Sequence, residues 1–400
     1  MNPTDFKNQK STKYGKQTTV CFIFNHSFFL GGGEVSFFEL IRTLDKKRIR
    51  PVVIVPDSGE IERNLKDNNI EVHIVRFPPI KNLIKFSPLK AFLDLLKIFK
   101  KRKIEIIHIN GSRACFYGGI TGRILRIPII WHVRESLTDF KIYDWLLGSL
   151  ADVIICVSKS VKLKRFKKFE KRISRKICIV YNGVDTSKFQ KNMKSRQKIR
   201  ALFSVKDSDI LIGLIGNLIP RKAQDFFLKG FAKSKQIQPD ISAKILIIGH
   251  FSDKKYYYYL QKLVDELKID SNVIFQKFSK DISNILSALD IFVLSSKSEG
   301  FSRSLLEAMS CGLPVIGTKI SENKEAIVDN KNGLLVDFMD INKMALAIIT
   351  LYKNEIMCKK IGSYNRSLVE KCFNLVSHAN QIEFIYSDIL REKRIFFSCK

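Results

Sequence analysis

Short apolar runs recur along the chain, and each is separated from the next by a stretch with helical periodicity. Apolar strands that alternate with helices form a parallel sheet whose two faces are both covered. Seven such runs occupy the first part of the chain, at residues 20–26, 51–56, 71–75, 103–110, 127–133, 151–158 and 176–183. Six more follow at residues 209–217, 243–250, 272–278, 290–296, 313–318 and 332–337. We therefore predict an α/β fold with two doubly wound parallel sheets.

A polar and basic stretch without an apolar run, residues 186–202, interrupts the pattern. This interruption predicts a boundary between two Rossmann-like domains, which we place at residues 1–188 and 189–373. Residues 374–400 are predicted as a C-terminal helix that crosses back to the first domain. The two domains are expected to face a cleft, because doubly wound sheets bind ligands at the carboxyl ends of their strands.

Basic residues are in large excess and are concentrated in one half of the chain. Lys and Arg number 69 against 39 Asp and Glu, a formal net charge of +30, of which residues 1–200 carry +24. Such an excess predicts an anionic partner: phospholipid, nucleic acid or a phosphorylated substrate. Nucleic acid is not expected, since the chain has no recognition helix or RNA-binding motif.

Two segments carry much of this charge. Residues 161–176 contain nine basic side chains and one acidic one, and residues 81–103 mix Lys with Phe, Leu and Ile at near-helical spacing. Basic and apolar residues at helical spacing suit an anionic bilayer surface. We favour a membrane or an anionic acceptor for 161–176, with a solvated basic face as the alternative. For residues 81–103 we favour a membrane contact and a solvated basic face equally.

The chain shows no sign of export or of a membrane span. Its first residues are polar, without the apolar core of a secretory signal, and no apolar stretch approaches the roughly 18–20 residues that a spanning helix needs. The eight cysteines are scattered, with no C-x-x-C pair, which favours buried reduced thiols. We expect a cytoplasmic protein, peripheral at the inner face of the plasma membrane.

Two motifs match known binding patterns only in part. Gly31, Gly32 and Gly33 follow a strand and open a helix, but the third glycine of a G-x-G-x-x-G dinucleotide motif would fall at Ser36. Asp207-Ser208-Asp209 has the form of a metal-binding D-x-D, but it precedes a strand, and a solvated turn is favoured. No metal site is predicted.

The most informative stretch is residues 290–318, DIFVLSSKSEGFSRSLLEAMSCGLPVIGT. A buried strand ends at Ser296, a loop holds Glu299 and Gly300, and a helix begins near Ser302. The free N–H groups of a helix N-terminus at the carboxyl edge of a sheet can bind a diphosphate. Glu299 and Glu307 would flank such phosphates, so they are better suited to accept hydrogen bonds from hydroxyls. Taken singly, each could instead be an acidic residue near the positive end of a helix.

With its flanking segments, E-G-F-S-R-S-L-L-E-A-M-S-C-G-L-P-V-I resembles the signature of the family-4 retaining glycosyltransferases, also called glycosyl transferases group 1. GGGE, YNGVD, GNLIPRK and ALDIFVLSS fall in the expected order, so the resemblance covers nearly the whole chain. It implies a GT-B architecture and a metal-independent, retaining hexosyltransferase. The resemblance implies no cofactor; the donor would be a UDP- or GDP-linked sugar.

The resemblance also implies roles for single residues. Glu307 would accept from the ribose hydroxyls, and Glu299 from hydroxyls of the donor sugar. Arg221 and Lys222 would neutralise the diphosphate in place of a metal. The backbone of Gly300, Phe301 and Ser302 would lie near the sugar and phosphates, the loop Gly31–Gly33 near the donor phosphate and the acceptor. His132 would contact the donor sugar and, with Glu299 and Lys222, form the expected catalytic set.

This sequence departs from the family pattern at three positions. Asn217, expected in the donor site, stands where the family often has an arginine. His250 and Lys277 stand where glycines are usual, and these changes are expected to alter the pocket for the nucleotide base.

The remaining candidates are weaker. His108 and His73 lie in apolar strands, which favours structural roles, whereas His26 is an even choice between a structural residue and a site residue. Arg134 and Glu135 follow His132 directly and are interpreted either as acceptor contacts or as a surface ion pair.

The function predicted from these observations is transfer of a sugar from a nucleoside-diphosphate sugar to a lipid-linked or cell-surface glycan, as in bacterial polysaccharide or lipopolysaccharide biosynthesis. Two alternatives stay open. A nucleotide-sugar epimerase of the same fold would need no acceptor. A non-catalytic binding protein for anionic glycans or lipids would show no turnover.

Overall fold

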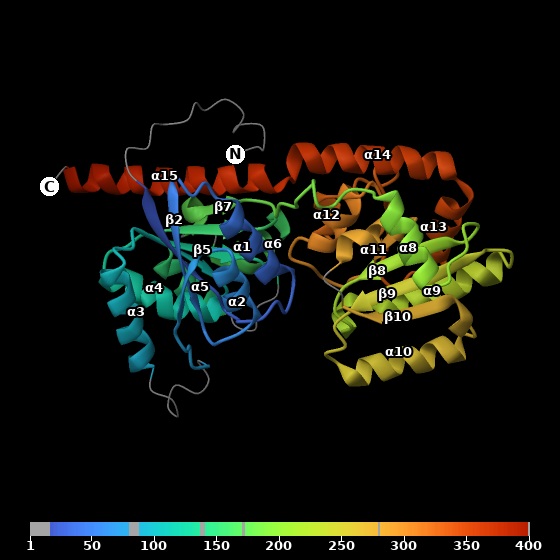
Figure 1. The fold of residues 1–400 in the computed structure, drawn as a ribbon, viewed down its shortest axis with the longest axis horizontal. Helices are drawn as coiled ribbons and strands as arrows, with labels where there is room; N and C mark the ends of the chain where they lie inside the picture. The colour runs from blue at the N-terminus through green and yellow to red at the C-terminus, as the bar shows by residue number, and fades with distance from the viewer. Residues whose placement is uncertain (1–16, 80–87, 137–140, 170–172, 279–280, 399–400) are drawn as a thin grey trace. The chain divides into compact units, whose positions relative to one another are not determined.

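The computed structural model describes residues 17–79, 88–136, 141–169, 173–278 and 281–398, of which the side chains of 141, 169 and 392–398 are left aside. The chain forms two compact units (Figure 1). Unit 1 comprises residues 1–183 and 375–400, and unit 2 comprises residues 184–374. The division falls at 183/184 and 374/375, within a few residues of the boundaries that we placed from the sequence.

Unit 1 is built on a seven-stranded sheet in the order β3-β2-β1-β4-β5-β6-β7, in which every neighbouring pair is parallel. The strands are β1 (Thr18–Ile23), β2 (Ile49–Val55), β3 (Glu71–Ile74), β4 (Ile106–Asn110), β5 (Ile129–Val133), β6 (Val153–Cys156) and β7 (Ile177–Ile179). Each overlaps one of the predicted apolar runs, although β1 and β2 begin two residues earlier. The central strands β1, β4 and β5 are buried throughout, which explains why their runs are continuous rather than alternating.

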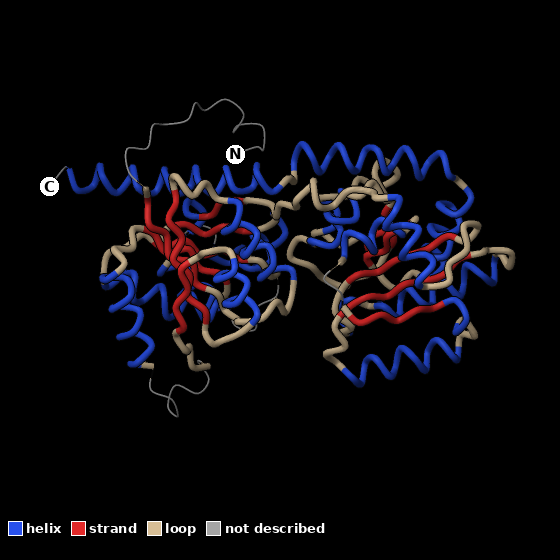
Figure 2. The backbone as a smooth tube through the Cα atoms, viewed as in Figure 1, coloured by secondary structure: helices blue, strands red, loops and turns tan. Residues whose placement is uncertain are grey.

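Unit 2 is built on a six-stranded parallel sheet in the order β10-β9-β8-β11-β12-β13. Its strands are β8 (Ile210–Ile215), β9 (Ala243–Gly249), β10 (Val273–Lys277), β11 (Ile291–Leu294), β12 (Val315–Thr318) and β13 (Leu334–Val336). Figure 2 shows the strands of each unit gathered between helices. The predicted class, two doubly wound α/β domains, is therefore confirmed.

The helices of unit 1 form two groups. In the first, α3 (Leu89–Lys101), α4 (Ser112–Ile124), α5 (Lys141–Leu150) and α6 (Lys159–Phe166) pack against one another in series. In the second, α1 (Gly32–Thr43) packs against the C-terminal helix α15 (Leu375–Ser398). Helix α2 (Glu60–Asp67) leads into β3.

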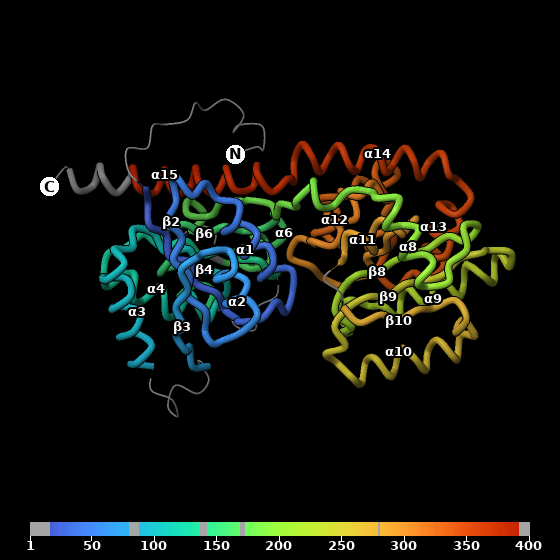
Figure 3. The backbone as a smooth tube through the Cα atoms, viewed as in Figure 1, coloured from blue at the N-terminus to red at the C-terminus, as the bar shows by residue number. Residues whose placement is uncertain are grey.

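The C-terminal helix belongs to unit 1 although the chain reaches it only after completing unit 2. Figure 3, coloured along the chain, shows red α15 beside the blue and green elements of unit 1. Its residues Ala379, Ile382, Tyr386 and Ile389 are buried in the same cluster as Phe22 and Phe37. These positions recur at intervals of three and four, so a single face of the helix supplies the packing.

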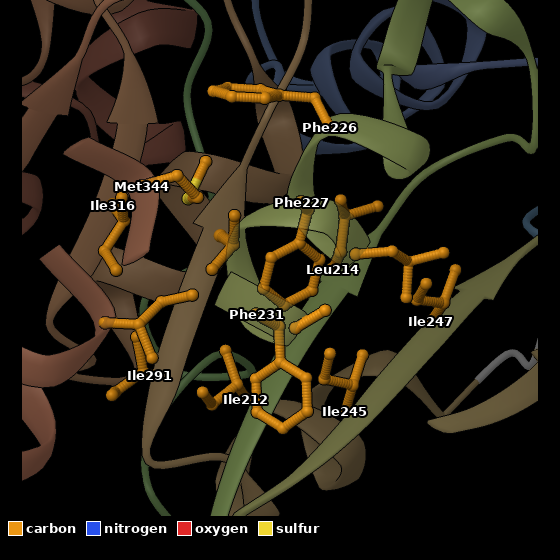
Figure 4. Packing of buried hydrophobic residues seen from close by; sticks show 14 of the residues in the cluster. Ile212, Leu214, Phe226, Phe227, Phe231, Ile245, Ile247, Ile291, Ile316 and Met344 are labelled. Carbon is orange, nitrogen blue, oxygen red and sulfur yellow. The ribbon is translucent and has the colours of Figure 1, made fainter. Parts of the chain in front are cut away.

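Unit 2 carries the helices α8 (Met193–Leu202), α9 (Gln224–Ile237), α10 (Lys254–Glu266), α11 (Ile282–Ala288), α12 (Arg303–Ser310), α13 (Ile341–Lys353) and α14 (Glu355–Cys372). Figure 4 shows its core, where Phe227 and Phe231 of α9 lie among Ile212, Leu214, Ile245 and Ile247 of the sheet. Gly213 allows β8 to pack closely here, because a Cβ at this position would stand 2.2 Å from Leu289.

Two further expectations concern cysteines and membrane spans. Of the cysteines in the described ranges, all are free thiols, and Cys21, Cys115, Cys156 and Cys311 are buried. None of the described helices is both long enough and apolar enough to cross a bilayer.

Candidate active site

The stretch singled out in the sequence forms the carboxyl edge of the unit 2 sheet. β11 ends at Leu294, and helix α12 begins at Arg303 after a short loop. Ser302 is the N-cap residue, and its Oγ accepts a hydrogen bond from Leu305 N at 3.4 Å. Phe301 is buried and packs on Phe373 with ring centroids 5.4 Å apart, so the loop is anchored on the helix side of Gly300.

Glu299 lies in this loop and is paired with two cations. Lys222 Nζ donates to Glu299 Oε1 at 2.6 Å, and Arg221 Nη1 stands 3.8 Å from Glu299 Oε2. The carboxylate is only 7% exposed. Burial would raise the pKa of Glu299, but Lys222 and then Arg221 attract its negative charge and hold the pKa below its usual range. The sequence-predicted residues Glu299, Arg221 and Lys222 are thus brought together.

The two cations are held in place by the loop that follows β11. They belong to a 3₁₀ turn, Pro220–Lys222, that follows β8. Lys297 N donates to Arg221 O at 2.8 Å, Ser295 Oγ donates to Lys222 O at 2.9 Å, and Arg221 Nη1 donates to Ser298 O at 2.8 Å. The carboxyl ends of β8 and β11 are thereby tied together, and a rigid frame of this kind can present two positive charges to a diphosphate.

Glu307 lies one turn into α12 and has a partner that sequence reasoning missed. Arg303 Nε donates to Glu307 Oε1 at 2.6 Å, and both side chains are about nine-tenths buried. The sequence could have indicated this pair, because residues four positions apart are neighbours on a helix. Nη1 of Arg303 is buried without a hydrogen-bond partner among the described residues, so this guanidinium can still donate to a ligand.

The positions that depart from the family pattern also lie at this edge. The backbone oxygen of Asn217, just beyond β8, accepts from Gln224 Nε2 at 3.0 Å. His250 follows β9 and stacks on Phe278 with ring centroids 4.7 Å apart, while Lys277 is exposed at the end of β10. The two expected glycines are therefore replaced by an exposed imidazole and an exposed ammonium group.

In unit 1, the glycine loop and the segment after β5 meet at Arg134. Gly31 is the N-cap of α1, and a Cβ on Gly33 would stand 3.5 Å from Arg134 Cδ. Arg134 donates through Nε to Asn110 Oδ1 at 2.9 Å and through Nη1 to Asn182 Oδ1 at 2.6 Å. It therefore connects the carboxyl ends of β4, β5 and β7. Neither sequence interpretation, an acceptor contact or a surface ion pair with Glu135, anticipated these amide partners.

His132 lies in β5 within a buried group of polar rings. It is fully buried, and its Nδ1 stands 3.1 Å from His108 Nε2 and 3.3 Å from Arg134 Nη2. The role of His132 as a contact to the donor sugar stays a prediction. His108 also bonds Tyr386 OH through Nδ1 at 2.6 Å, which fits its predicted structural role.

The other histidines lie outside this group. His26 is half-buried beside Asn25, with 3.0 Å between Asn25 Nδ2 and His26 Nε2. Burial, followed by Arg113, lowers the pKa of His26. His73 lies 2.7 Å from the Glu71 carboxylate on the partly buried strand β3, which fits its predicted structural role.

Asp209 of the D-x-D motif has a structural role. Asp209 Oδ1 accepts from Ser242 Oγ at 2.6 Å, and its Oδ2 accepts from Lys206 N at 3.0 Å. These bonds tie the start of β8 to the neighbouring loops. Within the ranges that the structure covers, no three His, Cys, Asp or Glu side chains gather as a metal site would require.

The basic segment 161–176 is only partly a surface. Lys164, Lys167 and Lys168 are exposed, but Arg165 is 6% exposed, donates through Nε to Asp144 Oδ2 at 3.0 Å and lies over the Trp131 ring at 5.3 Å. The interpretation of Arg165 as part of the basic surface was therefore wrong, because its guanidinium is paired with Asp144 inside unit 1. Residues 170–172 of this segment and residues 81–87 of the segment 81–103 lie outside the described ranges.

Family models match both halves of the chain. The model described as Glycosyltransferase Family 4 matches residues 30–188, and the model described as Glycosyl transferases group 1 matches residues 195–368. The second match contains the whole edge built around Glu299 and Glu307.

Curated relatives match over most of their length. The chain is 26% identical to the UDP-Gal:alpha-D-GlcNAc-diphosphoundecaprenol alpha-1,3-galactosyltransferase of Escherichia coli, covering 85% of this chain and 89% of the relative. It is 25% identical to the capsular polysaccharide biosynthesis glycosyltransferase CapM of Staphylococcus aureus, covering 88% and 93%.

Solved structures share the fold. HepE of Anabaena, crystallised with UDP, superposes with a TM-score of 0.82 at 21% identity, covering 93% of this chain and 100% of HepE. Its complex with UDP-glucose gives a TM-score of 0.81. This likeness shows a GT-B fold. Because the two family models together match residues 30–188 and 195–368, the chain belongs to the family-4 glycosyltransferases.

Proposed function

We propose that this glycosyltransferase moves a sugar from a UDP- or GDP-linked donor to a lipid-linked or cell-surface glycan, with retention of anomeric configuration and without a metal. The observation that carries the proposal is the edge of unit 2, where Lys222 and Arg221 meet the buried Glu299 beside the N-terminus of α12.

In this proposal, different residues of the edge bind different parts of the donor. The N–H groups of Phe301 to Ser304 and the cations Arg221 and Lys222 hold the diphosphate and stabilise the charge that develops as it leaves. A diphosphate drawing Lys222 toward itself would free Glu299 to accept hydrogen bonds from the sugar. Glu307, oriented by Arg303, accepts from the ribose hydroxyls.

The acceptor is proposed from the printed activities of relatives. The Escherichia coli relative is named for transfer to a diphosphoundecaprenol-linked sugar, and a Corynebacterium glutamicum relative, 24% identical, for transfer to a phosphatidylinositol mannoside. Both acceptors combine a lipid with an anionic phosphate. The net charge of +24 on residues 1–200 suits such an acceptor.

The outer surface of α5 and α6, two helices that pack against each other, supports the proposal of a peripheral membrane location. Ile142, Leu146 and Leu163 are 74%, 41% and 53% exposed, and Lys164, Lys167 and Lys168 are exposed in the same region. Apolar side chains among lysines suit an anionic bilayer, to which each nearby basic residue contributes about 1 kcal/mol.

Sedimentation with vesicles tests the membrane proposal. The protein should sediment with phosphatidylglycerol vesicles, be released by high salt, and stay in solution with phosphatidylcholine alone. The triple variant Lys164→Glu, Lys167→Glu, Lys168→Glu should no longer sediment. A matched charge reversal of the exposed Lys254, Lys255 and Lys262 on α10 should sediment like the wild type. Equal sedimentation of both variants would refute this surface.

The activity is tested with a panel of UDP- and GDP-sugars, first by thermal shift and then with a membrane lipid extract as the acceptor. We expect one donor to stabilise the protein and its sugar to enter the lipid fraction. Release of nucleoside diphosphate distinguishes the transferase from a binding protein. An epimerase would instead give a second sugar without any acceptor. NMR of the product then reads the anomeric configuration, and an inverted product would refute retention.

A further inference from the structure

Arg303 of unit 2 has a buried nitrogen whose N–H groups no described residue accepts. The side chain is 9% exposed, and its Nη1 is buried without a hydrogen-bond partner in the part of the chain that the structure covers. A guanidinium is always charged and carries five N–H donors. A buried donor of a charged group is costly to leave unpaired, so such atoms are rare in native proteins. The arrangement points to an acceptor other than the described residues.

The bond to Glu307 fixes the guanidinium without using Nη1. Arg303 Nε donates to Glu307 Oε1 at 2.6 Å, and the carboxylate lies four positions further along α12. Nε–H and Nη1 lie on different edges of the planar guanidinium, so the carboxylate bound at Nε leaves Nη1 to another partner. Arg303 is therefore oriented by one anion and can donate to a second.

The place of Arg303 in the helix favours a second anion. Arg303 is the first residue of α12, directly after the N-cap Ser302, and the first turn of this helix contains no acidic residue. The N-terminus of a helix is its positive end, where acidic side chains are stabilising and a cation is not. The unpaired backbone N–H groups of the first turn add further donors. An anionic ligand stabilises this accumulation of positive charge, whereas a neutral acceptor does so only weakly.

The ion pairs of the edge leave little positive charge for a diphosphate without Arg303. Arg221 and Lys222 are both paired with Glu299, and Arg221 is 41% exposed, so solvent screens much of its charge. With Arg303 and Glu307 included, three cations face two carboxylates, a net charge of +1. Without Arg303, two cations would face two carboxylates, and these groups would sum to zero. A nucleotide sugar carries a dianionic diphosphate, so the buried charge of Arg303 is the one that these pairs leave over.

We infer that Arg303 Nη1 donates to a phosphate of the nucleotide donor, so that one guanidinium joins Glu307 to the diphosphate. The inference rests on the proposed function and adds Arg303 as a binding residue in unit 2. A carbonyl of the base or a resident water could also accept from Nη1, but neither carries the negative charge that this edge attracts. The experiment must therefore separate a phosphate from these neutral acceptors.

Binding of nucleosides and nucleoside diphosphates tests the inference. Uridine and UDP share base and ribose and differ only in the diphosphate, as do guanosine and GDP. Calorimetry, with competition titrations for the weaker nucleosides, measures each against the full-length wild type and Arg303→Gln, which removes the charge but keeps an amide donor. We expect the variant to bind the preferred diphosphate about ten- to a hundredfold more weakly, the scale of a hydrogen bond to a charged group. Its affinity for the nucleoside should change little.

Two further variants show whether the loss belongs to the charge at this position. Arg303→Lys keeps the charge but not the planar guanidinium, so it should recover part of the affinity for the diphosphate. Lys262→Gln is the matched control, because exposed Lys262 on α10 pairs with Glu266 at the same spacing in the same unit. This control should bind both ligands like the wild type. Thermal unfolding without ligand identifies a variant that has lost its fold.

Arginine NMR of the wild type needs no folded variant at the binding step. With ¹⁵N-labelled arginine, the guanidinium signal of Arg303 is the one missing from Arg303→Lys. This signal should shift when UDP or GDP, whichever binds, is added, and should shift much less with the corresponding nucleoside. Equal shifts with nucleoside and diphosphate would contradict a bond to phosphate.

The outcomes separate this inference from the proposed function. If neither UDP nor GDP binds the wild type, the proposed donor function fails and the inference falls with it. If Arg303→Gln weakens nucleoside and diphosphate equally, Arg303 only orients Glu307 on the ribose or contacts the base, and the inference is wrong. Unchanged binding of both ligands would show that Nη1 holds a resident water only. A loss confined to the diphosphate supports the inference.

Discussion

We predict that the buried histidines of unit 1 make its stability depend on pH between 7.5 and 5.5. His108, His132 and His378 are fully or almost fully buried, and burial is the main cause that lowers the pKa of each. In the unfolded chain their pKa returns to about 6.5. As the pH falls through that value, the unfolded state binds protons that the native state does not, so the free energy of unfolding decreases.

The size of the effect follows from the same pKa values. Between pH 7.5 and 5.5, a histidine that stays neutral in the native state loses about 1.4 kcal/mol relative to the unfolded chain. Three of them lose about 4 kcal/mol, which is a large part of the 5–15 kcal/mol typical of a domain. Glu34 and Glu383, whose pKa values burial raises, act in the opposite direction, so a comparison of variants is needed.

The assay is urea denaturation at both pH values, followed by tryptophan fluorescence. The two tryptophans of the chain, Trp131 and Trp145, lie in unit 1, so the signal reports this unit alone. His378→Phe should reduce the pH-dependent loss by about 1.4 kcal/mol, because one proton-binding group is removed. Tyr386→Phe removes a hydrogen bond but no histidine, so it should lower stability equally at both pH values. An unchanged loss in His378→Phe would refute the buried neutral histidine.

Three further outcomes are expected. Glu299→Ala should reduce sugar transfer strongly while changing the affinity for free nucleoside diphosphate less, and an equal loss in both measurements would place Glu299 on the nucleotide instead. Transfer should survive treatment with EDTA, and its loss with recovery on adding magnesium or manganese would refute the metal-free mechanism. Arg165→Glu should destabilise unit 1 by roughly 3–5 kcal/mol in urea denaturation, because it leaves Asp144 buried beside a second negative charge, whereas Lys164→Glu on the exposed surface should be nearly neutral.

The strands were predictable because both sheets are buried on both faces. A doubly covered parallel strand is a continuous apolar run, and each predicted run overlaps a strand. The ends were less certain. β1 begins at Thr18, before the predicted start, because backbone pairing with Ile49 includes residues whose side chains carry no apolar signal.

The arrangement of residues at the edge of unit 2 was predictable because these residues follow short, regular connections. A strand, a glycine loop and a helix in direct succession fix where Glu299 and Glu307 must lie. Arg303 was missed, although its spacing from Glu307 is that of neighbours on a helix.

The buried group of polar rings in unit 1, which contains His108, His132 and Tyr386, could not be predicted. These residues are far apart in the sequence. Tyr386 and His108 are separated by 278 positions and meet only because α15 packs on unit 1. The burial of Arg165 could not be predicted either. A run of basic residues suggests a uniform surface, but helical geometry turns one of them toward Asp144.

The central claim is that the edge of unit 2 around α12 binds the diphosphate and ribose of the donor. Calorimetric titration of UDP and GDP into the wild type, Glu307→Ala and the control Glu266→Ala tests it most directly, because Glu266 is an exposed helical glutamate paired with Lys262 in the same unit. We predict that one nucleotide binds the wild type and the control equally and binds Glu307→Ala more weakly by about 1–3 kcal/mol. Equal binding to all three proteins, or no binding of either nucleotide, would contradict this account of the site.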